Sequence, residues 1–186
     1  ARGHCEALAP LVVEALAAAR TSAGRLAAIA VGVGPGAYTG LRVGIVTALS
    51  MADALAVPVH GVVSLDALAF GSGLGAPFAV VTDARRKEVF WARYADRATR
   101  LSGPEVGRPD EVAAAVAGLP VVGASGTPFA GRFTDVRGPD LPSAGALGCL
   151  AAGRLASGGG LLLPQPVYLR RPDVTVSAGP HRVGRR

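Results

Sequence analysis

The sequence contains few cysteines, lysines and aromatic residues. Cys5 and Cys149 are its only cysteines, and they stand far apart without Cys-x-x-Cys spacing. We therefore predict two buried thiols in a reducing compartment and no disulfide framework. No apolar run approaches the ~20 residues that a membrane-spanning helix needs, and no signal peptide is visible. We expect a cytoplasmic protein that has no membrane partner.

The positive charge of the chain is concentrated near its end. The 186 residues carry a formal net charge of +6, although Lys87 is the only lysine. From Tyr168 onward, five arginines and one aspartate contribute +4, so the rest of the chain carries only +2. This distribution does not predict a basic nucleic-acid-binding face on the body of the protein. We expect a flexible basic tail over residues 175–186, with contact between the tail and tRNA phosphates as an open alternative.

Hydrophobic periodicity predicts an α/β protein, because half of the residues are hydrophobic and helical patterns alternate with strand-like ones. In the first part, residues 4–20, 39–56 and 65–70 fit helices, residues 26–34 and 57–63 fit buried strands, and Ser64 is a candidate N-cap. The glycine-rich residues 71–75 are the predicted boundary between two lobes.

The second part continues the alternation. Residues 78–82 and 89–94 fit a β-hairpin whose charged turn spans residues 83–87. Residues 110–117 and 143–157 fit helices, residues 120–123 fit a strand, and residues 164–171 fit an extended segment. We therefore predict two α/β lobes with largely parallel sheets. The first spans residues 1–74, the second spans residues 75–174, and the tail follows.

The densest glycine pattern spans residues 32–44, with the sequence GVGPGAYTGLRVG. A dinucleotide-binding fingerprint requires an acidic residue at the end of the next strand, where Val62 and Val63 stand. A Walker A loop requires a lysine after its last glycine, and Leu41 stands there instead. The preferred interpretation is structural: a tight strand-to-helix turn, followed by a stripe of small residues that permits close helix packing.

This glycine pattern, followed by VPVHGVVSLDALA, VTDARRKEVFWARY and VYLRRPDV in the same order, resembles the TsaB (YeaZ) family. The resemblance covers residues 4–174, and it departs from the family pattern at Ala37 and at Leu49-Ser50. It implies two RNase H-like lobes of the actin-like ATPase superfamily. Family members begin with additional strands ahead of the helix that contains His4, so we expect the first lobe to be incomplete in this sequence.

The resemblance also implies that the protein is not itself an enzyme. The related catalytic subunit, TsaD, carries a His-x-x-x-His metal motif, and the matching positions here are Ser64 and Leu68. His4, His60 and His181 have no ligand spacing, and no serine or cysteine nucleophile has a neighbouring base. We expect no catalytic residue, no metal site and no intrinsic cofactor. Asp83 and Asp66 are interpreted as a hairpin hydrogen-bond acceptor and a first-turn helix residue.

The function that the resemblance implies is that of a scaffold in tRNA threonylcarbamoylation. The expected partners are a TsaD-like catalytic subunit, a TsaE-like ATPase through which ATP enters, and a second copy of the chain when it is alone; tRNA is contacted indirectly. The helices over residues 4–20 and 39–56 are apolar on more than one side, which favours burial by a partner. The expected interface residues are Leu8, Leu11, Val12, Gly40, Val43, Gly44, Val46 and Thr47. The alternative is a nucleotide-hydrolysing or metallopeptidase-like enzyme whose active residues lie upstream.

Overall fold

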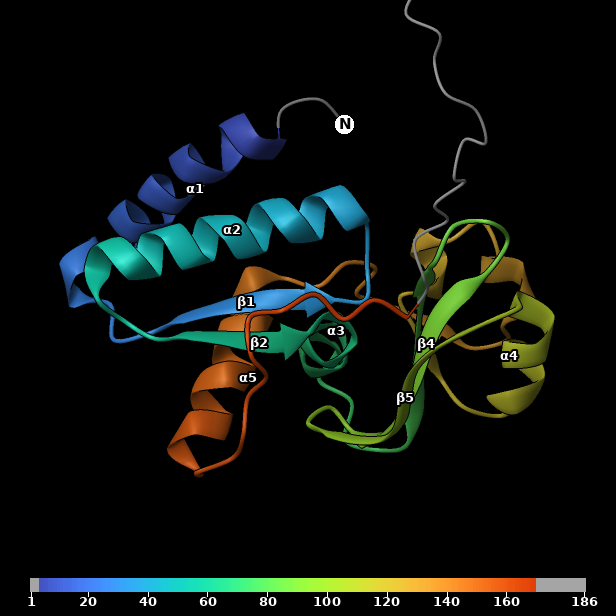
Figure 1. Ribbon diagram of the computed structural model, residues 1–186. Helices are drawn as coiled ribbons and strands as arrows, with labels where there is room; N and C mark the ends of the chain where they lie inside the picture. Colours follow the sequence, from blue (N-terminus) through green and yellow to red (C-terminus); the bar gives the residue numbers. More distant parts are fainter. Residues whose placement is uncertain (1–3, 170–186) are drawn as a thin grey trace, which may run out of the picture.

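The structure, a computed structural model, describes residues 4–169 and contains two β-sheets with helices packed around them (Figure 1). The predicted tail over residues 175–186 lies outside the described residues. The helices are α1 (His4–Ala18), α2 (Tyr38–Leu55), α3 (Ser64–Ser72), α4 (Pro109–Ala115) and α5 (Ala144–Ala156). The strands are β1 (Ile29–Gly34), β2 (Val59–Val63), β3 (Phe78–Asp83), β4 (Val89–Asp96), β5 (Thr99–Gly107), β6 (Val121–Val122) and β7 (Val136–Arg137).

The first sheet consists of the parallel strands β1 and β2, in a register that pairs Ile29 with Val59. Helix α2 covers one face of this sheet, while α3 and α5 lie on the other face (Figure 1). Val31 and Val33 of β1 pack against Ile45 and Ala48 of α2. The apolar run of the strand and the helical spacing of the small and branched residues thus produce the predicted strand–helix contact.

The second sheet has the strand order β5-β4-β3-β6-β7 and is mixed. Strands β3, β4 and β5 are antiparallel, whereas β3, β6 and β7 are parallel. The prediction of largely parallel sheets is therefore wrong for this sheet, because short turns join β3, β4 and β5 directly and such turns permit only antiparallel pairing. Strand β5 was not predicted because it contains Gly103 and Pro104, which an edge strand tolerates.

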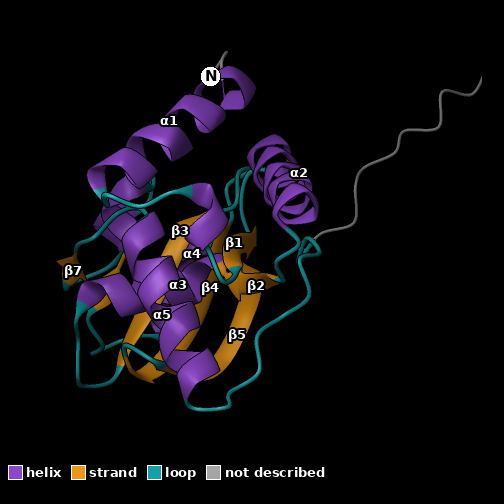
Figure 2. Ribbon diagram, turned by 90° about the vertical axis from the view of Figure 1, so that its left-hand side faces the viewer, coloured by secondary structure: helices purple, strands orange, loops and turns teal. Residues whose placement is uncertain are grey.

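The predicted lobe boundary is crossed by contacts that return to the first sheet. Helix α5 packs on α3 and contacts both β1 and β2 (Figure 2). The segment that follows α5 pairs Leu162 with Gly61 of β2, and the Val167 N–H donates to the Val33 carbonyl at 2.7 Å. A Cβ atom at Gly61 would lie 2.5 Å from the Leu163 carbonyl oxygen, so this close approach requires glycine. We call β1, β2, α1, α2 and α5 the first half of the molecule, and β3–β7 with α4 the second half.

Local details correct two expectations and add a cap to a predicted helix. Val63, not Ser64, is the N-cap of α3, and no side chain caps that helix. The predicted helix over residues 143–157 has a true cap, because the Ser143 Oγ accepts from the Ala146 N–H at 3.0 Å. Cys149 is exposed on α5 and not buried as predicted.

Among the described helices, none is both long and apolar enough to cross a membrane.

Candidate functional site

The outer side of α2 is an apolar surface at the edge of the molecule. Ile45, Ala48 and Ala52 are buried and face the sheet, as their spacing predicts. Outside this buried stripe, Val46 is 60% exposed and Leu49 is 43% exposed. Apolar side chains on two sides are typical of a helix that packs against other protein surfaces on both of those sides.

Helix α1 extends this apolar surface. It lies across α2 on the side away from the sheet, and the two helices contact each other (Figure 1). Leu11 is 56% exposed and Val13 is 66% exposed, and none of residues 7–18 is buried. We call the outer sides of α1 and α2 together the α1–α2 face. Single exposed apolar residues are ordinary, but several on two adjacent helices are typical of an interaction site.

The eight predicted interface residues all lie on α1 or α2, and they differ in exposure. Leu11, Gly40 and Val46 are exposed, and Leu8, Val12, Val43, Gly44 and Thr47 are half-buried. Sequence reasoning missed Val13 and Leu49, which lie beside predicted residues. Leu49 lies outside the stripe of α2 that packs on the sheet, and Val13 is an apolar residue next to the predicted Val12; these positions are the signal by which they could have been found.

The two glycines of α2 occupy different environments. Apart from the neighbouring backbone of α2 itself, a Cβ atom at Gly40 would meet no described atom within 4 Å, so this position is open within the chain. A Cβ atom at Gly44 would lie 4.0 Å from the Val31 side chain, which places Gly44 toward β1 and away from the α1–α2 face. Within the described chain, neither glycine is under a close helix contact, and Gly40 is the more open of the two.

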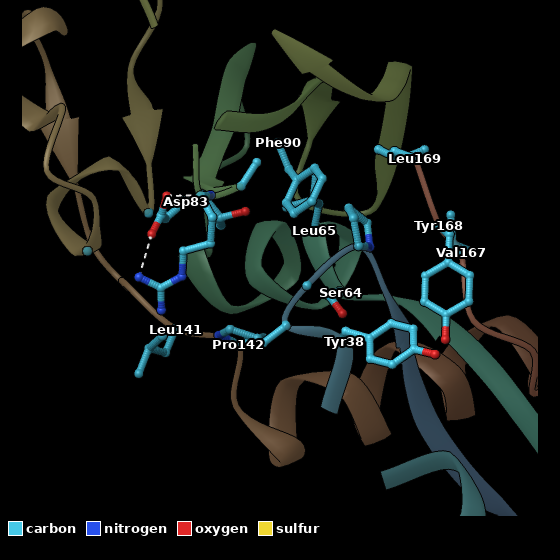
Figure 3. Close-up of a pocket in the computed structure, with 18 of the residues that line it drawn as sticks. Tyr38, Ser64, Leu65, Asp83, Phe90, Leu141, Pro142, Val167, Tyr168 and Leu169 are labelled. Carbon is cyan, nitrogen blue, oxygen red and sulfur yellow. Dashed lines mark hydrogen bonds and ion pairs between the residues drawn. The ribbon is translucent and has the colours of Figure 1, made fainter. Parts of the chain in front are cut away.

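A cleft of about 1000 Å³ lies between the two halves (Figure 3). Its wall includes the turn before α2, the first residues of α3 and the hairpin turn after β3. Leu65 and Phe90 contribute apolar surface, while Ser64, Asp83 and Arg85 contribute polar groups. The volume is that of a small-molecule pocket, although the lining residues include no histidine, cysteine or lysine within the described chain.

Aromatic rings stand at one side of the cleft. Tyr38 at the start of α2 stacks on Tyr168 of the C-terminal segment, with ring centroids 5.5 Å apart. The Arg42 guanidinium lies 4.6 Å from the Tyr38 ring centroid, a distance suited to a cation–π contact. These contacts fix the C-terminal segment against the N-terminal end of α2, so the cleft and the α1–α2 face share one helix.

The Asp83 side chain binds groups of its own hairpin turn. Its Oδ1 accepts the Arg85 backbone N–H at 2.8 Å, and its Oδ2 lies 3.1 Å from the Arg85 guanidinium. Arg85, Arg86 and Lys87 all have left-handed backbone conformations, with φ between 53° and 62°, which L-residues adopt at a cost. The carboxylate thus stabilises an unfavourable turn, which confirms the interpretation of Asp83 as a hairpin acceptor.

Ser64 and Leu68, which the resemblance places at the positions of the TsaD histidines, have separate environments. Ser64 lies in the cleft wall, whereas Leu68 is fully buried in the core between α3 and the second sheet. His60 is half-buried on β2, and His181 lies outside the described residues. Within residues 4–169, no three His, Cys, Asp or Glu side chains are grouped so that they could hold a metal ion.

Comparisons with known proteins identify the family. Residues 1–125 match the family model of TsaD, tRNA N6-adenosine threonylcarbamoyltransferase. Protein Rv3421c of Mycobacterium tuberculosis is 45% identical over 93% of this chain and 78% of its own length. TsaB, the tRNA threonylcarbamoyladenosine biosynthesis protein of Escherichia coli, is 37% identical over 50% of this chain, and the match spans 42% of that protein.

The solved structures agree with the sequence comparisons. YeaZ from Pseudomonas aeruginosa superimposes with a TM-score of 0.78 and 31% identity, over 89% of this chain and 85% of that chain. The α/β class is confirmed, and the arrangement is compatible with an actin-like ATPase fold. The chain therefore belongs to the TsaB (YeaZ) family, a relative of the TsaD transferases.

Proposed function

We propose that the protein is a non-catalytic subunit in the threonylcarbamoylation of tRNA adenosine, and that it acts by binding a TsaD-type catalytic subunit through the α1–α2 face. Membership of the TsaB family supports the place in threonylcarbamoyladenosine biosynthesis. The observation that carries the mode of action is the apolar outer side of α2, with Val46 and Leu49 exposed beside the exposed Leu11 and Val13 of α1.

The physical argument for pairing is the cost of leaving this face in water. Covering apolar surface contributes ~25 cal/mol per Å², and stable interfaces cover ~800 Å² on each partner. Two helices placed side by side offer a surface that two helices of a partner can match, with ridges of one pair packed into grooves of the other. The open position at Gly40 permits close approach of the partner's backbone.

The proposed complex has the following composition. A TsaD-type subunit, when present, occupies the α1–α2 face, and a second copy of the chain occupies it when the protein is alone. A TsaE-type ATPase joins the pair, ATP enters only through that complex, and tRNA is held mainly by the partner. The chain contributes no cofactor and no catalytic residue of its own.

An enzymatic function is the alternative, and the cleft is the feature that favours it. The P. aeruginosa structure described as similar to peptidase YeaZ raises the same question. A peptidase of the serine type requires a base beside its nucleophile, and no histidine stands among the described residues that line the cleft near Ser64. Asp83, the carboxylate beside the apolar wall, is already engaged by Arg85.

Reconstitution separates the two functions. The purified full-length chain is mixed with a TsaD-type subunit, a TsaE-type ATPase, ATP, threonylcarbamoyl adenylate and tRNA, and modified adenosine is measured by mass spectrometry. We expect modification only when all protein components are present, and a complex of this chain with TsaD on size-exclusion chromatography. Modification or peptide cleavage by the chain alone would overturn the proposal, as would unchanged TsaD activity without it.

A further inference from the structure

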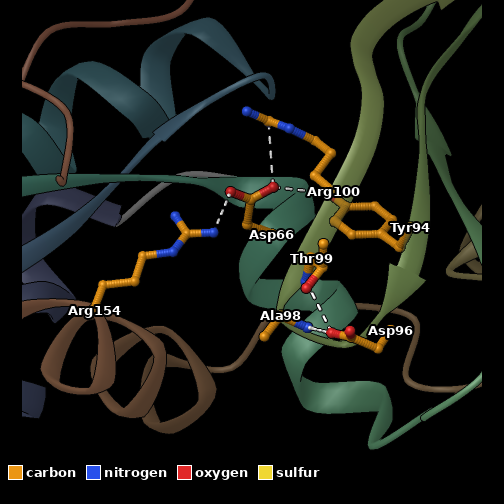
Figure 4. A network of polar contacts seen from close by, with 7 residues as sticks. All are labelled: Asp66, Tyr94, Asp96, Ala98, Thr99, Arg100 and Arg154. Carbon is orange, nitrogen blue, oxygen red and sulfur yellow. Dashed lines mark hydrogen bonds and ion pairs between the residues drawn. The ribbon is translucent and has the colours of Figure 1, made fainter. Parts of the chain in front are cut away.

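We propose that the Asp66 side chain fixes the orientation of the second half of the molecule relative to the first. Its side chain lies in the first turn of α3, the helix that connects β2 of the first sheet to β3 of the second. Asp66 is only 2% exposed, and Figure 4 shows three side chains converging on it. We call Asp66, Tyr94, Arg100 and Arg154 the Asp66 cluster.

The two carboxylate oxygens of Asp66 divide their partners between the halves. Oδ1 accepts from the Tyr94 hydroxyl at 2.9 Å and lies 3.2 Å from the Arg100 Nη1. Tyr94 and Arg100 belong to β4 and β5 of the second sheet. Oδ2 accepts from the Arg154 Nη2 at 3.1 Å, and Arg154 belongs to α5, which covers the first sheet. One carboxylate thus joins both halves.

The electrostatics make this connection sensitive to orientation. A buried carboxylate is tolerated only while charged or polar partners surround it. If the halves rotate relative to each other, one oxygen loses its partner while it remains in a region of low dielectric constant. Burial, together with the negative charge of Asp66, raises the pKa of the Tyr94 hydroxyl, which therefore stays protonated and continues to donate. Both guanidiniums are less than one-third exposed.

Apolar packing alone would define the orientation less well. Leu65 and Leu68 of α3 pack against the second sheet, and Ala67 packs toward Leu150 of α5. Such contacts are non-directional and allow small shifts at little cost. The hydrogen bonds that Asp66 accepts from Tyr94 and Arg154 are directional and restrict such shifts, and the cleft lies beside this connection, because Leu65 of the same helix turn lines it.

Distances between spin labels in the full chain test whether Asp66 fixes the relative orientation of the two halves. One label is attached to the exposed Cys149 of α5, and the second is attached to a Glu111→Cys substitution on the exposed side of α4. Both are made in a Cys5→Ser background. This pair spans the two halves. A second pair, Cys149 with Ala54→Cys on α2, lies within the first half and serves as the control.

We expect Asp66→Asn to widen or shift the distance distribution across the halves while the control distribution stays unchanged. Arg154→Met, which removes only the connection to α5, is expected to do the same and serves if Asp66→Asn does not fold. A distribution across the halves that is unchanged in a folded variant would overturn the proposal. Equal widening of the control pair would also overturn it, because α5 would then have detached from its own sheet. Neither result depends on the proposed partner.

Discussion

Val46→Glu is the substitution that tests the α1–α2 face most directly. Val46 is 60% exposed on the outer side of α2, so the new carboxylate stays in water in the free chain. Surface substitutions of this kind usually change the free energy of unfolding by less than ~0.5 kcal/mol. We therefore expect a folded monomer with a nearly unchanged melting temperature.

The effect on pairing is much larger. Full burial of a valine side chain contributes ~1.5–3 kcal/mol, so covering the exposed part of Val46 contributes ~1–2 kcal/mol that the variant loses. An unpaired carboxylate at the centre of an interface adds a desolvation cost of several kcal/mol. A total of ~4 kcal/mol corresponds to a roughly thousandfold loss of affinity.

Titration calorimetry with the TsaD-type subunit measures this loss, and tRNA modification in the reconstituted reaction reports its consequence. Ala114→Glu, on the exposed side of α4 in the second half, is the matched control because it adds the same charge to another helix. We expect the control to bind normally. If Val46→Glu binds its partner and supports modification as well as the control does, the interface lies elsewhere on the molecule.

Three further substitutions test individual positions. Gly61→Ala should unfold the C-terminal segment, because the added Cβ would lie 2.5 Å from a backbone carbonyl oxygen; a wild-type melting temperature would contradict this. Gly40→Leu should leave the melting temperature of the free chain unchanged but weaken pairing, and a destabilised monomer would show that the position is packed. Tyr94→Phe should cost ~1.5–3 kcal/mol in denaturant unfolding, because a hydrogen bond to a charged group is lost. The pKa of Tyr94 is raised in the folded state, so the free energy of unfolding of the wild type should fall as the pH rises above ~10, the tyrosine pKa of the unfolded chain. Tyr94→Phe should lack this part of the pH dependence. Equal pH dependence in the two proteins would contradict the hydrogen bond between Tyr94 and Asp66.

Much of the fold could be predicted from the sequence because local patterns and final packing agree. The predicted helix over residues 39–56 is observed as α2, and the predicted hairpin is observed as β3 and β4. Strand β5 could not be predicted from local pattern, since Gly103 and Pro104 are unfavourable in strands and only its position at the sheet edge tolerates them. The return of residues 161–169 to the first sheet is likewise a tertiary contact that sequence order conceals.

The same distinction applies to the site. The apolar outer side of α2 follows from helical periodicity, so Val46 could be placed before the structure was known. Asp66 was interpreted as a helix-dipole residue, because nothing in its own segment reveals the partners. Arg100 of β5 is 34 residues away from Asp66 in the sequence, and Arg154 of α5 is 88 residues away. Only the folded chain brings them to one carboxylate.

The distribution of burial is consistent with the proposal that the α1–α2 face of the first half binds a partner. The strands β3 and β4 are firmly packed, and Phe78, Val80 and Ala92 are fully buried. In contrast, α2 contains three buried residues, and residues 7–18 of α1 contain none. Segments with few buried apolar contacts open most easily, and a partner that binds only the folded form stabilises those segments most. Under the proposed function, the first half, whose outer helices bury the fewest residues, is therefore the half that a partner would stabilise most, and the Asp66 cluster connects it to the more fully buried second half.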